Sequence, residues 1–427
     1  MCVVFAFRRL FPAILFIIFI TPTAFAQPIK IGFLYVFSGR LAHYGYAAKQ
    51  GATLAIDDIN SKGGILGRKV IGVYEDTKLD PATGVKAAEK LIKNERVDVL
   101  MGIVSSGVAK AVAPVANEYK VPLIITLAMT PDVTGKICNR YTFRVSLNGP
   151  QNLRCAAKLA SGMDVKKWTT MGPDYLFGYQ CWEYFQKYLK KLKPNATFVS
   201  NDKIAYAPVS TTEFGPYIDK VLKSGADGVL VSLYGGNLND FIRQGWSKGL
   251  FDKKIKFLMN LAYSYDVLAG LGMDMPTGVW LGGLYWFENN SDPLNKRFVD
   301  AYKAKYRIWP DYNSSGAYSG VLAYAAAAAK AGSIDANSIV NALEGLTLDL
   351  PAGMVTIRAE DHQALLPAVW GKTGKYDPKL RSRTIKPLSV FQADKIIRPI
   401  DETECKRRVA KPAKPEEKNK TAGRNEK

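Results

Sequence analysis

The feature that most constrains the fold is a regular alternation of short apolar runs and amphipathic stretches, which occurs twice along the chain. The first round covers residues 29–126 and begins with the apolar run Ile29–Tyr35, followed by a helical pattern over Tyr44–Asn60. The second round follows Asn148 and extends to Met259. Strands that alternate with helices of this length are typical of a parallel sheet with helices on both faces. We therefore expect an α/β fold with two doubly wound, Rossmann-like lobes.

The other elements of the two rounds follow from the same periodicity. The further strands expected are Lys69–Tyr74, Val97–Val104, Leu123–Thr126, Trp168–Gly172, Ala196–Ile204, Gly228–Leu233 and Ile255–Met259. The further helices expected are Pro81–Lys93, Ala109–Tyr119, Gln151–Ser161, Gly178–Lys190, Thr212–Ser224 and Asn237–Lys248. The helical stretches Leu294–Tyr306 and Ser315–Ala331 have no strands of their own to cover, so we expect them to pack on the first lobe. Residues 354–391 are expected to form short strands and turns.

The length of the chain predicts two domains. A chain of 427 residues exceeds what one hydrophobic core usually serves. We expect an N-terminal lobe made of residues 27–148 plus about 277–360, and a C-terminal lobe made of residues 149–276 plus about 361–400. The crossings between the two lobes would then form a hinge.

The N-terminus has the pattern of a Sec signal peptide. Two arginines precede the apolar run Leu10–Ile20, and Ala24-Phe25-Ala26 supplies the small residues that signal peptidase requires. The run is far shorter than the ~20 apolar residues that cross a bilayer. We expect residues 1–26 to be removed and the mature chain, which starts at Gln27, to be soluble and periplasmic.

The chain is basic, with a formal net charge of +20. Such a surplus can indicate nucleic-acid binding, but export places the chain where nucleic acid is not the usual partner, so we expect none. Part of the surplus lies in residues 405–427, a segment without aromatic residues or an apolar period. We expect this segment to be a basic, disordered tail.

Four cysteines follow the expected cleavage site, namely Cys138, Cys155, Cys181 and Cys405. The periplasm is oxidising and permits disulfides, and four cysteines allow three pairings that the sequence does not distinguish. Their spacings match no metal-binding motif. We therefore leave the pairing open and expect no metal.

The residue constellations of common enzymes are missing from the sequence. The chain has two histidines, His43 and His362, and it has neither an HExxH nor a GxSxG motif. The glycine-rich run Gly63–Gly67 lies after a predicted helix, whereas a dinucleotide-binding fingerprint follows a strand. We therefore expect no cofactor and no enzyme. A hydrolase that uses His43 as its base is the remote alternative.

Six loops follow predicted strands and carry serines and tyrosines but few charges. In open parallel sheets, ligands bind outside the carboxyl ends of the strands. The six loops are Phe37–Tyr46, Ser105–Ala109, Leu127–Thr134, Asp174–Gly178, Tyr234–Asn237 and Asn260–Tyr265. Their composition suits a cleft for a small ligand, with an apolar floor and a few directed donors.

A series of short motifs, in family order over roughly residues 29–375, resembles the leucine/isoleucine/valine-binding proteins of ABC transporters. The motifs are Ile31-Gly32-Phe33, Phe37-Ser38-Gly39, Tyr44-Gly45, Ala55-Ile56-Asp57-Asp58-Ile59-Asn60, Gly63-Gly64-Ile65-Leu66-Gly67, Asp76-Thr77, Ser105-Ser106, Pro122-Leu123-Ile124, Pro131-Asp132-Val133-Thr134, Phe143-Arg144, Asp174-Tyr175, Phe177-Gly178, Gly235-Gly236 and Phe241-Ile242-Arg243-Gln244. The resemblance implies a type I periplasmic-binding fold, in which two α/β lobes are joined by three crossovers and hold a ligand between them.

The resemblance also implies ligand-binding positions. Tyr44 corresponds to the aromatic residue that lies against the ligand, and Ser105 and Ser106 correspond to the serines that bind its carboxylate with hydroxyls and helix N-terminal amides. Simple helix capping is the alternative role of the two serines. Phe177 takes the place of the usual tyrosine on the second lobe, and Tyr234 falls in the next loop.

Two positions depart from the family pattern. In the loop Leu127-Ala128-Met129-Thr130, Met129 stands where a threonine usually completes the carboxylate site, and a shift of register by one residue would place Thr130 there instead. Ala128 is a further candidate contact in this loop. The loop that begins at Asn260, a further candidate contact, has no acid before Asp266, although amino-acid binders place the partner of the ligand ammonium there. A buried ammonium without a partner costs several kcal/mol. Either Asp266 reaches the pocket or the ligand has no ammonium, and we favour the second.

These features predict an extracytoplasmic solute-binding protein of an ABC importer. Its partners would be a small organic ligand and a membrane permease, and we expect the protein to be a monomer. The ligand expected is an apolar or aromatic carboxylate rather than a branched-chain amino acid. A ligand-sensing receptor on the same fold, which signals to a membrane kinase, is the alternative function.

Overall fold

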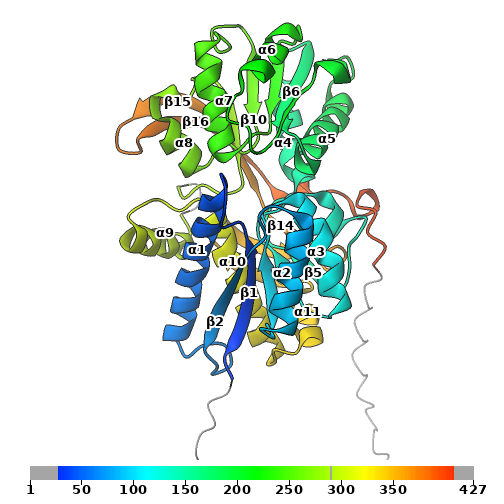
Figure 1. Ribbon diagram of the computed structural model, residues 1–427, viewed down its shortest axis with the longest axis vertical. Helices are drawn as coiled ribbons and strands as arrows, with labels where there is room; N and C mark the ends of the chain where they lie inside the picture. Colours follow the sequence, from blue (N-terminus) through cyan, green and yellow to red (C-terminus); the bar gives the residue numbers. More distant parts are fainter. Residues whose placement is uncertain (1–26, 289–290, 408–427) are drawn as a thin grey trace, which may run out of the picture.

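The computed structural model describes residues 27–288 and 291–407 of the chain. The expected signal peptide and residues 408–427 of the expected tail lie outside these ranges. The described chain forms two α/β lobes, which lie one above the other in Figure 1. Among the described helices, none combines the length and apolar character that a membrane crossing requires.

The first lobe, at the bottom of Figure 1, is built on a parallel sheet of five strands in the order β2-β1-β3-β4-β5. The strands are β1 (Ile29–Tyr35), β2 (Val70–Asp76), β3 (Val99–Gly102), β4 (Leu123–Ile125) and β5 (Thr142–Arg144). The helices are α1 (Ala42–Ser61), α2 (Pro81–Lys93), α3 (Ser106–Glu118), α9 (Pro293–Tyr306), α10 (Tyr312–Ala331) and α11 (Ala336–Leu343). Helices α2 and α3 pack together, as do α1 and α10, so α10 lies on the first lobe as expected.

A small antiparallel sheet completes the first lobe. It consists of β12 (Thr347–Leu350), β13 (Gly353–Ile357) and β14 (Ala364–Leu365). A single β-bridge between Arg144 and Gln363 attaches this sheet to the edge of β5. The first lobe is therefore completed by residues far along the chain from its five-stranded sheet.

The second lobe contains an eight-stranded sheet in the order β16-β15-β11-β10-β9-β6-β7, with β8 also paired to β6. The strands are β6 (Lys167–Pro173), β7 (Thr197–Phe198), β8 (Ala205–Ala207), β9 (Gly228–Val231), β10 (Lys256–Met259), β11 (Trp280–Gly283), β15 (Ala368–Asp377) and β16 (Ser382–Phe391). The helices are α4 (Gly149–Ser161), α5 (Leu176–Leu192), α6 (Gly215–Lys223), α7 (Gly235–Ser247), α8 (Tyr265–Leu271) and α12 (Ala393–Ile396). Strand β15 pairs antiparallel with both β11 and β16, and the other pairings of this sheet are parallel.

Capping residues fix where the helices begin. Asp80 accepts a hydrogen bond from the backbone N–H of Thr83, with Pro81 at the first helical position of α2. Reciprocal capping boxes begin α4 and α10. The box of α10 joins Asp311 and Ser314, so the helix begins at Tyr312 rather than at the expected Ser315. This shift brings the side chain of Tyr312 into the site described below.

The chain passes between the two lobes after β5, after β11 and after β14, which confirms two doubly wound lobes with three crossovers. Two of the approximate boundaries shift by a few residues. Strand β11 pairs with β10 and β15, so the chain leaves the second lobe after Gly283 rather than at about 277. Strand β14 pairs with β13, so the last crossing follows Leu365 rather than residue 360.

Local differences from the expected elements have simple causes. Of the strand expected at Ala196–Ile204, only β7 forms, because the 3₁₀ turn Asn201–Lys203 interrupts it; β8 follows the turn and lies beyond the expected range. The strands β5, β11 and β12 and the helices α8, α11 and α12 were not expected. Each has eight residues or fewer, which carry too few repeats of a period to be recognised in a sequence.

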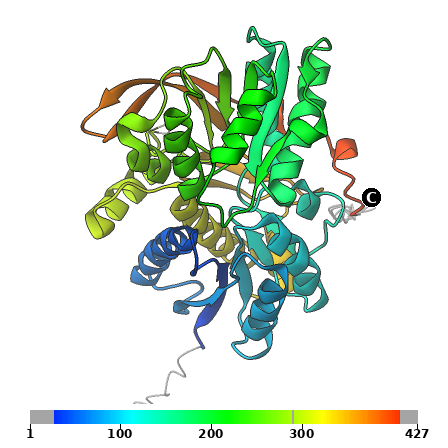
Figure 2. The ribbon, with the colours of Figure 1, turned by 45° about the horizontal axis from the view of Figure 1, so that its top comes forward.

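The last described residues return to the first lobe. After α12, residues 397–407, which we name the C-terminal strap, run along the side of the molecule from the upper to the lower lobe (Figures 1 and 2, in red). Cys405 forms a disulfide with Cys138 of the first lobe, whereas Cys155 and Cys181 are buried free thiols. The disordered tail expected from Cys405 is therefore wrong for residues 405–407, which the disulfide holds on the fold.

Candidate functional site

Both large sheets change winding direction at a switch point. The order of the first sheet places its switch point between β1 and β3, and the matching order β7-β6-β9-β10-β11 places the second between β6 and β9. Ligands of open α/β sheets bind at such points, outside the carboxyl ends of the strands. The loops after these four strands meet across the lobes, where the rings of Tyr44 and Tyr234 stack with centroids 5.9 Å apart.

Three helix N-termini point into this region. Helix α3 begins after Ser105, α5 after Tyr175 and α7 after Tyr234. The hydroxyl of Ser105 accepts a long hydrogen bond of 3.4 Å from the backbone N–H of Val108, and the two tyrosines make no capping bond to their own helices. The first N–H groups of a helix have no intrahelical acceptor and carry partial positive charge. The arrangement therefore favours an anionic group.

The centre of the site is a small inner pocket with a cavity volume of about 20 Å³. It is lined by Tyr44, Val104, Ser106, Leu127, Met129, Tyr175, Phe177, Tyr234, Leu261 and Tyr312. The volume accommodates about one water molecule. Tyrosine side chains fill most of the centre, because the hydroxyls of Tyr44 and Tyr312 lie 2.6 Å apart and those of Tyr175 and Tyr234 lie 2.9 Å apart.

The lining of the inner pocket is polar without being charged. Burial raises the pKa of Tyr234 to about 12, and burial also raises the pKa values of Tyr44 and Tyr312 well above their usual range. These hydroxyls are therefore neutral at physiological pH and can donate hydrogen bonds. Ser106 is 1% exposed, and its hydroxyl has no hydrogen-bond partner in the described part of the chain. It can therefore donate a hydrogen bond to a ligand.

A larger outer chamber of about 680 Å³ adjoins the inner pocket, with which it shares Tyr175 and Tyr234. It is lined by Ser38, Gly39, Arg40, Leu41, Lys78, Leu79, Pro81, Ser105, Gly107, Tyr175, Leu176, Val209, Ser210 and Tyr234. Both lobes contribute to its walls. Its volume lies in the range of ordinary small-molecule sites, about 300–1,000 Å³.

Two carboxylates lie beside the pocket but do not line it. Asp266 accepts a hydrogen bond from the hydroxyl of Ser264, and its other oxygen lies 3.7 Å from Nε2 of His43 on the opposite lobe. Asp311 caps α10. Burial opposes protonation of His43, but the neighbouring Asp266 outweighs it and raises the pKa of His43. Burial, together with Asp266, raises the pKa of Asp311.

The residues expected from the sequence divide into two groups. Those that line the inner pocket are Tyr44, Ser106, Met129, Phe177 and Tyr234, and Ser105 lines the outer chamber. Ala128 and Asn260 line neither space. Ala128 packs in the apolar cluster between the sheet and helices α2 and α3. The amide nitrogen of Asn260 donates to Sγ of Cys181 at 3.3 Å, so its side chain serves the core of the second lobe.

Sequence reasoning did not name, among the ligand-binding positions, five residues that line the inner pocket, namely Val104, Leu127, Tyr175, Leu261 and Tyr312. Tyr312 begins α10, a helix that was expected only as packing for the first lobe. The signal available was the pair Asp311 and Ser314, which has the spacing of a capping box and places the helix start at the tyrosine. Leu261 lies within the loop that was expected to reach the site, one residue after Asn260.

The backbone just before Ser105 is strained. Gly102 has φ 122°, and a Cβ there would lie 2.6 Å from the carbonyl oxygen of Leu34. Ile103 has φ 72°, which is unusual for a β-branched residue. Strained backbone of this kind gathers at functional sites, where it costs about 1–3 kcal/mol per residue. The surrounding structure therefore holds the chain that leads into α3 in a conformation that is locally unfavourable in free energy.

Residues 28–372 match the family model described as periplasmic binding protein. The chain belongs to this family. This confirms the resemblance seen in its sequence motifs. Members of the family are solute-binding proteins of ABC transporters and are not enzymes, so this chain is a solute-binding protein. No group of three or more His, Cys, Asp or Glu side chains in residues 27–288 and 291–407 is placed to hold a metal ion.

Individual relatives cover most of the chain. It is 26% identical to a leucine-, isoleucine-, valine-, threonine- and alanine-binding protein of Pseudomonas aeruginosa, over 81% of this chain and 90% of that protein. It is 30% identical to the Leu/Ile/Val-binding protein BraC3 of Rhizobium johnstonii, over 78% of this chain and 88% of the relative. A solute-binding protein of Rhodopseudomonas palustris HaA2, solved in complex with p-hydroxybenzoic acid, shares 25% identity with a TM-score of 0.77 and covers 86% of this chain and 98% of its own.

Proposed function

We propose that this solute-binding protein carries a carboxylate that lacks an ammonium group and has an apolar or aromatic body, and that it delivers this ligand from the periplasm to the permease of an ABC importer. The observation that supports this proposal best is the lining of the site. Hydroxyl groups and helix N-termini surround it, whereas none of the acidic side chains in the described residues lines it. The site therefore suits an anionic group of a ligand and not a cationic one.

The anionic side of the ligand would lie at the N-terminus of α3. The hydroxyl of Ser106 and the backbone N–H groups of Ser106 and Gly107 are available there, because none has an intrahelical acceptor. A hydrogen bond to a charged group contributes about 1.5–3 kcal/mol. The partial positive charge at the helix end adds to this contribution. A carboxylate is therefore the group that α3 would bind best.

The cationic side of an amino acid has no corresponding site. Asp266 is the first acid after β10, and its two oxygens already meet the hydroxyl of Ser264 and the imidazole of His43. To bind an ammonium, Asp266 would have to lose these contacts and pass the tyrosine pair Tyr44 and Tyr312. This supports an amine-free ligand over the amino acids of the Pseudomonas relative, and the p-hydroxybenzoic acid complex offers a precedent within the fold.

Ligand binding would also favour a closed arrangement of the lobes. Ser106 belongs to the first lobe, and Phe177 and Tyr234 belong to the second, so a ligand contacts all of them only when the lobes are together. A ligand shifts a conformational equilibrium toward the state that it binds better. The closed state would then be the form that the permease recognises.

Calorimetric titration of the mature protein tests the ligand class. The compounds are benzoate, 4-hydroxybenzoate, leucine and 4-methylpentanoate, which is the leucine skeleton without its amine. We expect 4-methylpentanoate or the benzoates to bind at least tenfold more tightly than leucine. Micromolar binding of leucine without binding of 4-methylpentanoate would refute the proposal and make Asp266 the first residue to mutate.

We also propose that export precedes this function and that the mature chain begins at Gln27. The signal-peptide pattern of residues 1–26 supports this proposal. The intact mass of the exported protein decides it, because a species that retains these residues would be about 26 residues heavier.

A further inference from the structure

We infer that the body of the ligand extends outward into the outer chamber and does not fill the inner pocket, so that the ligand is an elongated carboxylate with a second polar or anionic group. This rests on the proposed function, because it takes the carboxylate site at α3 as its starting point. The inference adds the direction in which the ligand body extends, the length of that body and a second contact with the protein.

The N-terminus of α3 forms a wall shared by the two spaces. Ser106 faces the inner pocket, and the adjacent Ser105 and Gly107 face the outer chamber. A carboxylate bound to this helix end therefore lies at the junction of the two spaces. The rest of the ligand can continue in one of two directions.

The inner direction offers too little room. A cavity of about 150 Å³ holds one benzene ring, whereas the inner pocket has about 20 Å³. Enlarging the pocket would require moving a tyrosine. The four tyrosine hydroxyls are hydrogen-bonded in two pairs, so this movement would break a hydrogen bond. Buried hydroxyls that lose a partner cost about 1–3 kcal/mol each. We therefore assign the tyrosines to the floor of the site.

The outer direction offers both room and apolar contact. The chamber has about 680 Å³, and its apolar wall includes Leu41, Leu79 and Pro81 from the first lobe and Leu176 and Val209 from the second. An extended apolar body there would contact both lobes at once. Burying apolar surface contributes about 25 cal/mol per Å², so affinity should increase with ligand length.

One cation of the chamber remains available. Arg40 is paired with Asp240 across the lobes, whereas the ammonium of Lys78 takes part in no ion pair within the described residues. The nearby Asp76 accepts hydrogen bonds from the backbone N–H groups of Phe37 and Lys78. The hydroxyl of Ser38 also donates to Asp76. Together with the hydroxyl of Ser210 in the same lining, Lys78 would favour a ligand that carries a second acceptor group.

A ladder of ligands tests the direction and the length. Straight-chain carboxylates from butanoate to decanoate, and α,ω-dicarboxylates of equal length, are titrated by calorimetry into the mature protein. We expect the Kd to fall at least tenfold from butanoate to octanoate. We also expect octanedioate to bind more tightly than octanoate. Equal or tighter binding of the short acids would overturn the inference while leaving the proposed function in place.

Two variants locate the contacts. Val209→Trp fills the outer chamber and should weaken octanoate binding at least tenfold, and by more than it weakens butanoate binding. Lys78→Ala should weaken octanedioate binding more than octanoate binding, and Lys86→Ala, which replaces an exposed lysine on α2, is its matched control. If Val209→Trp changes neither ligand, the body does not lie in the chamber. If no carboxylate binds and leucine does, the proposed function itself fails.

Discussion

The two lobes meet on two sides, and the two sides are held together by different chemistry. On the cleft side the contacts are the ion pair of Arg40 with Asp240, the approach of His43 to Asp266 and one tyrosine stack. The side chains of the two charged pairs are 23–41% exposed. Exposed ion pairs contribute about 0–1 kcal/mol each. The cleft side can therefore separate at low cost.

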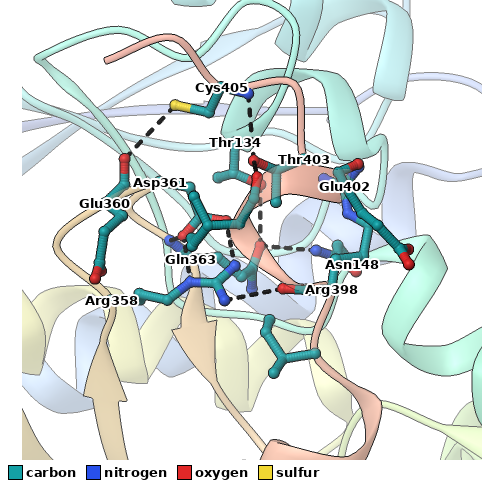
Figure 3. A network of polar contacts seen from close by, with 12 residues as sticks. Thr134, Asn148, Arg358, Glu360, Asp361, Gln363, Arg398, Glu402, Thr403 and Cys405 are labelled. Atoms are coloured by element: carbon teal, nitrogen blue, oxygen red, sulfur yellow. Dashed lines mark hydrogen bonds and ion pairs between the residues drawn. The ribbon is translucent and has the colours of Figure 1, made fainter. Parts of the chain in front are cut away.

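The hinge side is buried, hydrogen-bonded and covalently linked. Arg144 is fully buried, and its guanidinium donates to Oε1 of Gln363 at 3.1 Å and to the carbonyl oxygen of Thr130 at 2.5 Å. Figure 3 shows how Gln363 also accepts a hydrogen bond from the side chain of Asn148, a residue of the first crossover. Burial lowers the pKa of Arg144 to about 9, so it is still charged at neutral pH.

The C-terminal strap adds a fourth connection on this side. Its Glu402 pairs with Arg154 of the second lobe at 2.9 Å. Arg398 donates to the carbonyl oxygen of Pro131 in the first lobe at 3.2 Å, and Cys405 completes the disulfide with Cys138. Figure 3 shows Arg398 and Glu402 beside the crossover residue Asn148. The strap thus follows the hinge from one lobe to the other.

This contrast indicates how the molecule can move. A closure motion needs one side that opens and one side that keeps its contacts. The chain places its exposed ion pairs at the cleft and its buried, charged hydrogen bonds beside the hinge. The comparison therefore predicts that hinge substitutions change stability most, whereas cleft substitutions change affinity.

The largest effect is expected from Arg144→Ala. The substitution leaves the carbonyl oxygen of Thr130 without this donor in the buried interior, which costs about 1–3 kcal/mol. It also removes one of the donors to Gln363 and leaves a cavity where the buried side chain was, which adds to the cost. We expect a loss of about 4 kcal/mol in the free energy of unfolding, measured by urea denaturation. Arg243→Ala, which removes an exposed ion pair with Asp274, is the control and should cost less than about 1 kcal/mol. Similar losses for both variants would contradict the distinction between hinge and surface.

The second-largest effect on stability is expected from removal of the disulfide in the C-terminal strap. Replacing Cys138 and Cys405 together by serine should lower the free energy of unfolding by about 3 kcal/mol, because the bond restricts the unfolded chain across 267 residues. Reductant should destabilise the unaltered protein by the same amount and should leave the serine variant unchanged. Equal stability with and without reductant would show that the strap contributes little.

The outcome at the hinge shows where sequence reasoning reaches its limit. The two windings, their order and the loops of the site followed from periodicity, because each strand and helix carries its own local pattern. The hinge did not, since Arg144, Gln363 and Cys405 are far apart in sequence and meet only through tertiary contacts. No local pattern specifies such a meeting, and the disulfide pairing stayed open for the same reason.

The candidate site shows the same division. Tyr44 and Ser106 could be placed because motifs at strand ends carry them. Asn260 could not be placed correctly, since a shift of one residue around a buried turn exchanges it with Leu261 as the residue that faces the pocket. The small volume of the inner pocket was equally hidden, because it results from how tyrosines of four different segments pack.

On the cleft side, the two neighbouring serines should behave differently. Ser106→Ala removes the free hydroxyl and should weaken carboxylate binding about tenfold or more, which corresponds to the 1.5–3 kcal/mol of a hydrogen bond to a charged group. Ser105→Ala removes a helix cap and should instead cost about 1 kcal/mol of stability. Calorimetry and urea unfolding of both variants separate the two roles. Unchanged affinity in Ser106→Ala would remove this serine from the site.

The smallest effect concerns the pH dependence of closure, through the contact between His43 and Asp266 across the lobes. When the lobes are apart, His43 has no such neighbour and keeps its ordinary pKa of ~6.5. In the closed state Asp266, assisted by Asp311, raises the pKa of His43. A raised pKa means that protonated His43 stabilises closure fully below the ordinary value, and that this contribution is lost as the pH rises through the raised value.

Ligand affinity, which depends on closure, should therefore fall from pH 6 to pH 8.5. The change should remain below about tenfold, because the side chain of His43 is 41% exposed and solvent screens the pair. The ligand carboxylate and the tyrosines do not titrate in this interval, and His43→Gln should make the profile flat. The other histidine, His362, is buried near the hinge, and burial lowers its pKa. Its protonation would reduce the stability of the fold at acidic pH, and this effect would also be seen in the His43→Gln variant. If the variant retains the full slope between pH 6 and 8.5, the contact of His43 with Asp266 does not contribute to closure, and the cleft side is held by its tyrosines and by the pair of Arg40 with Asp240 alone.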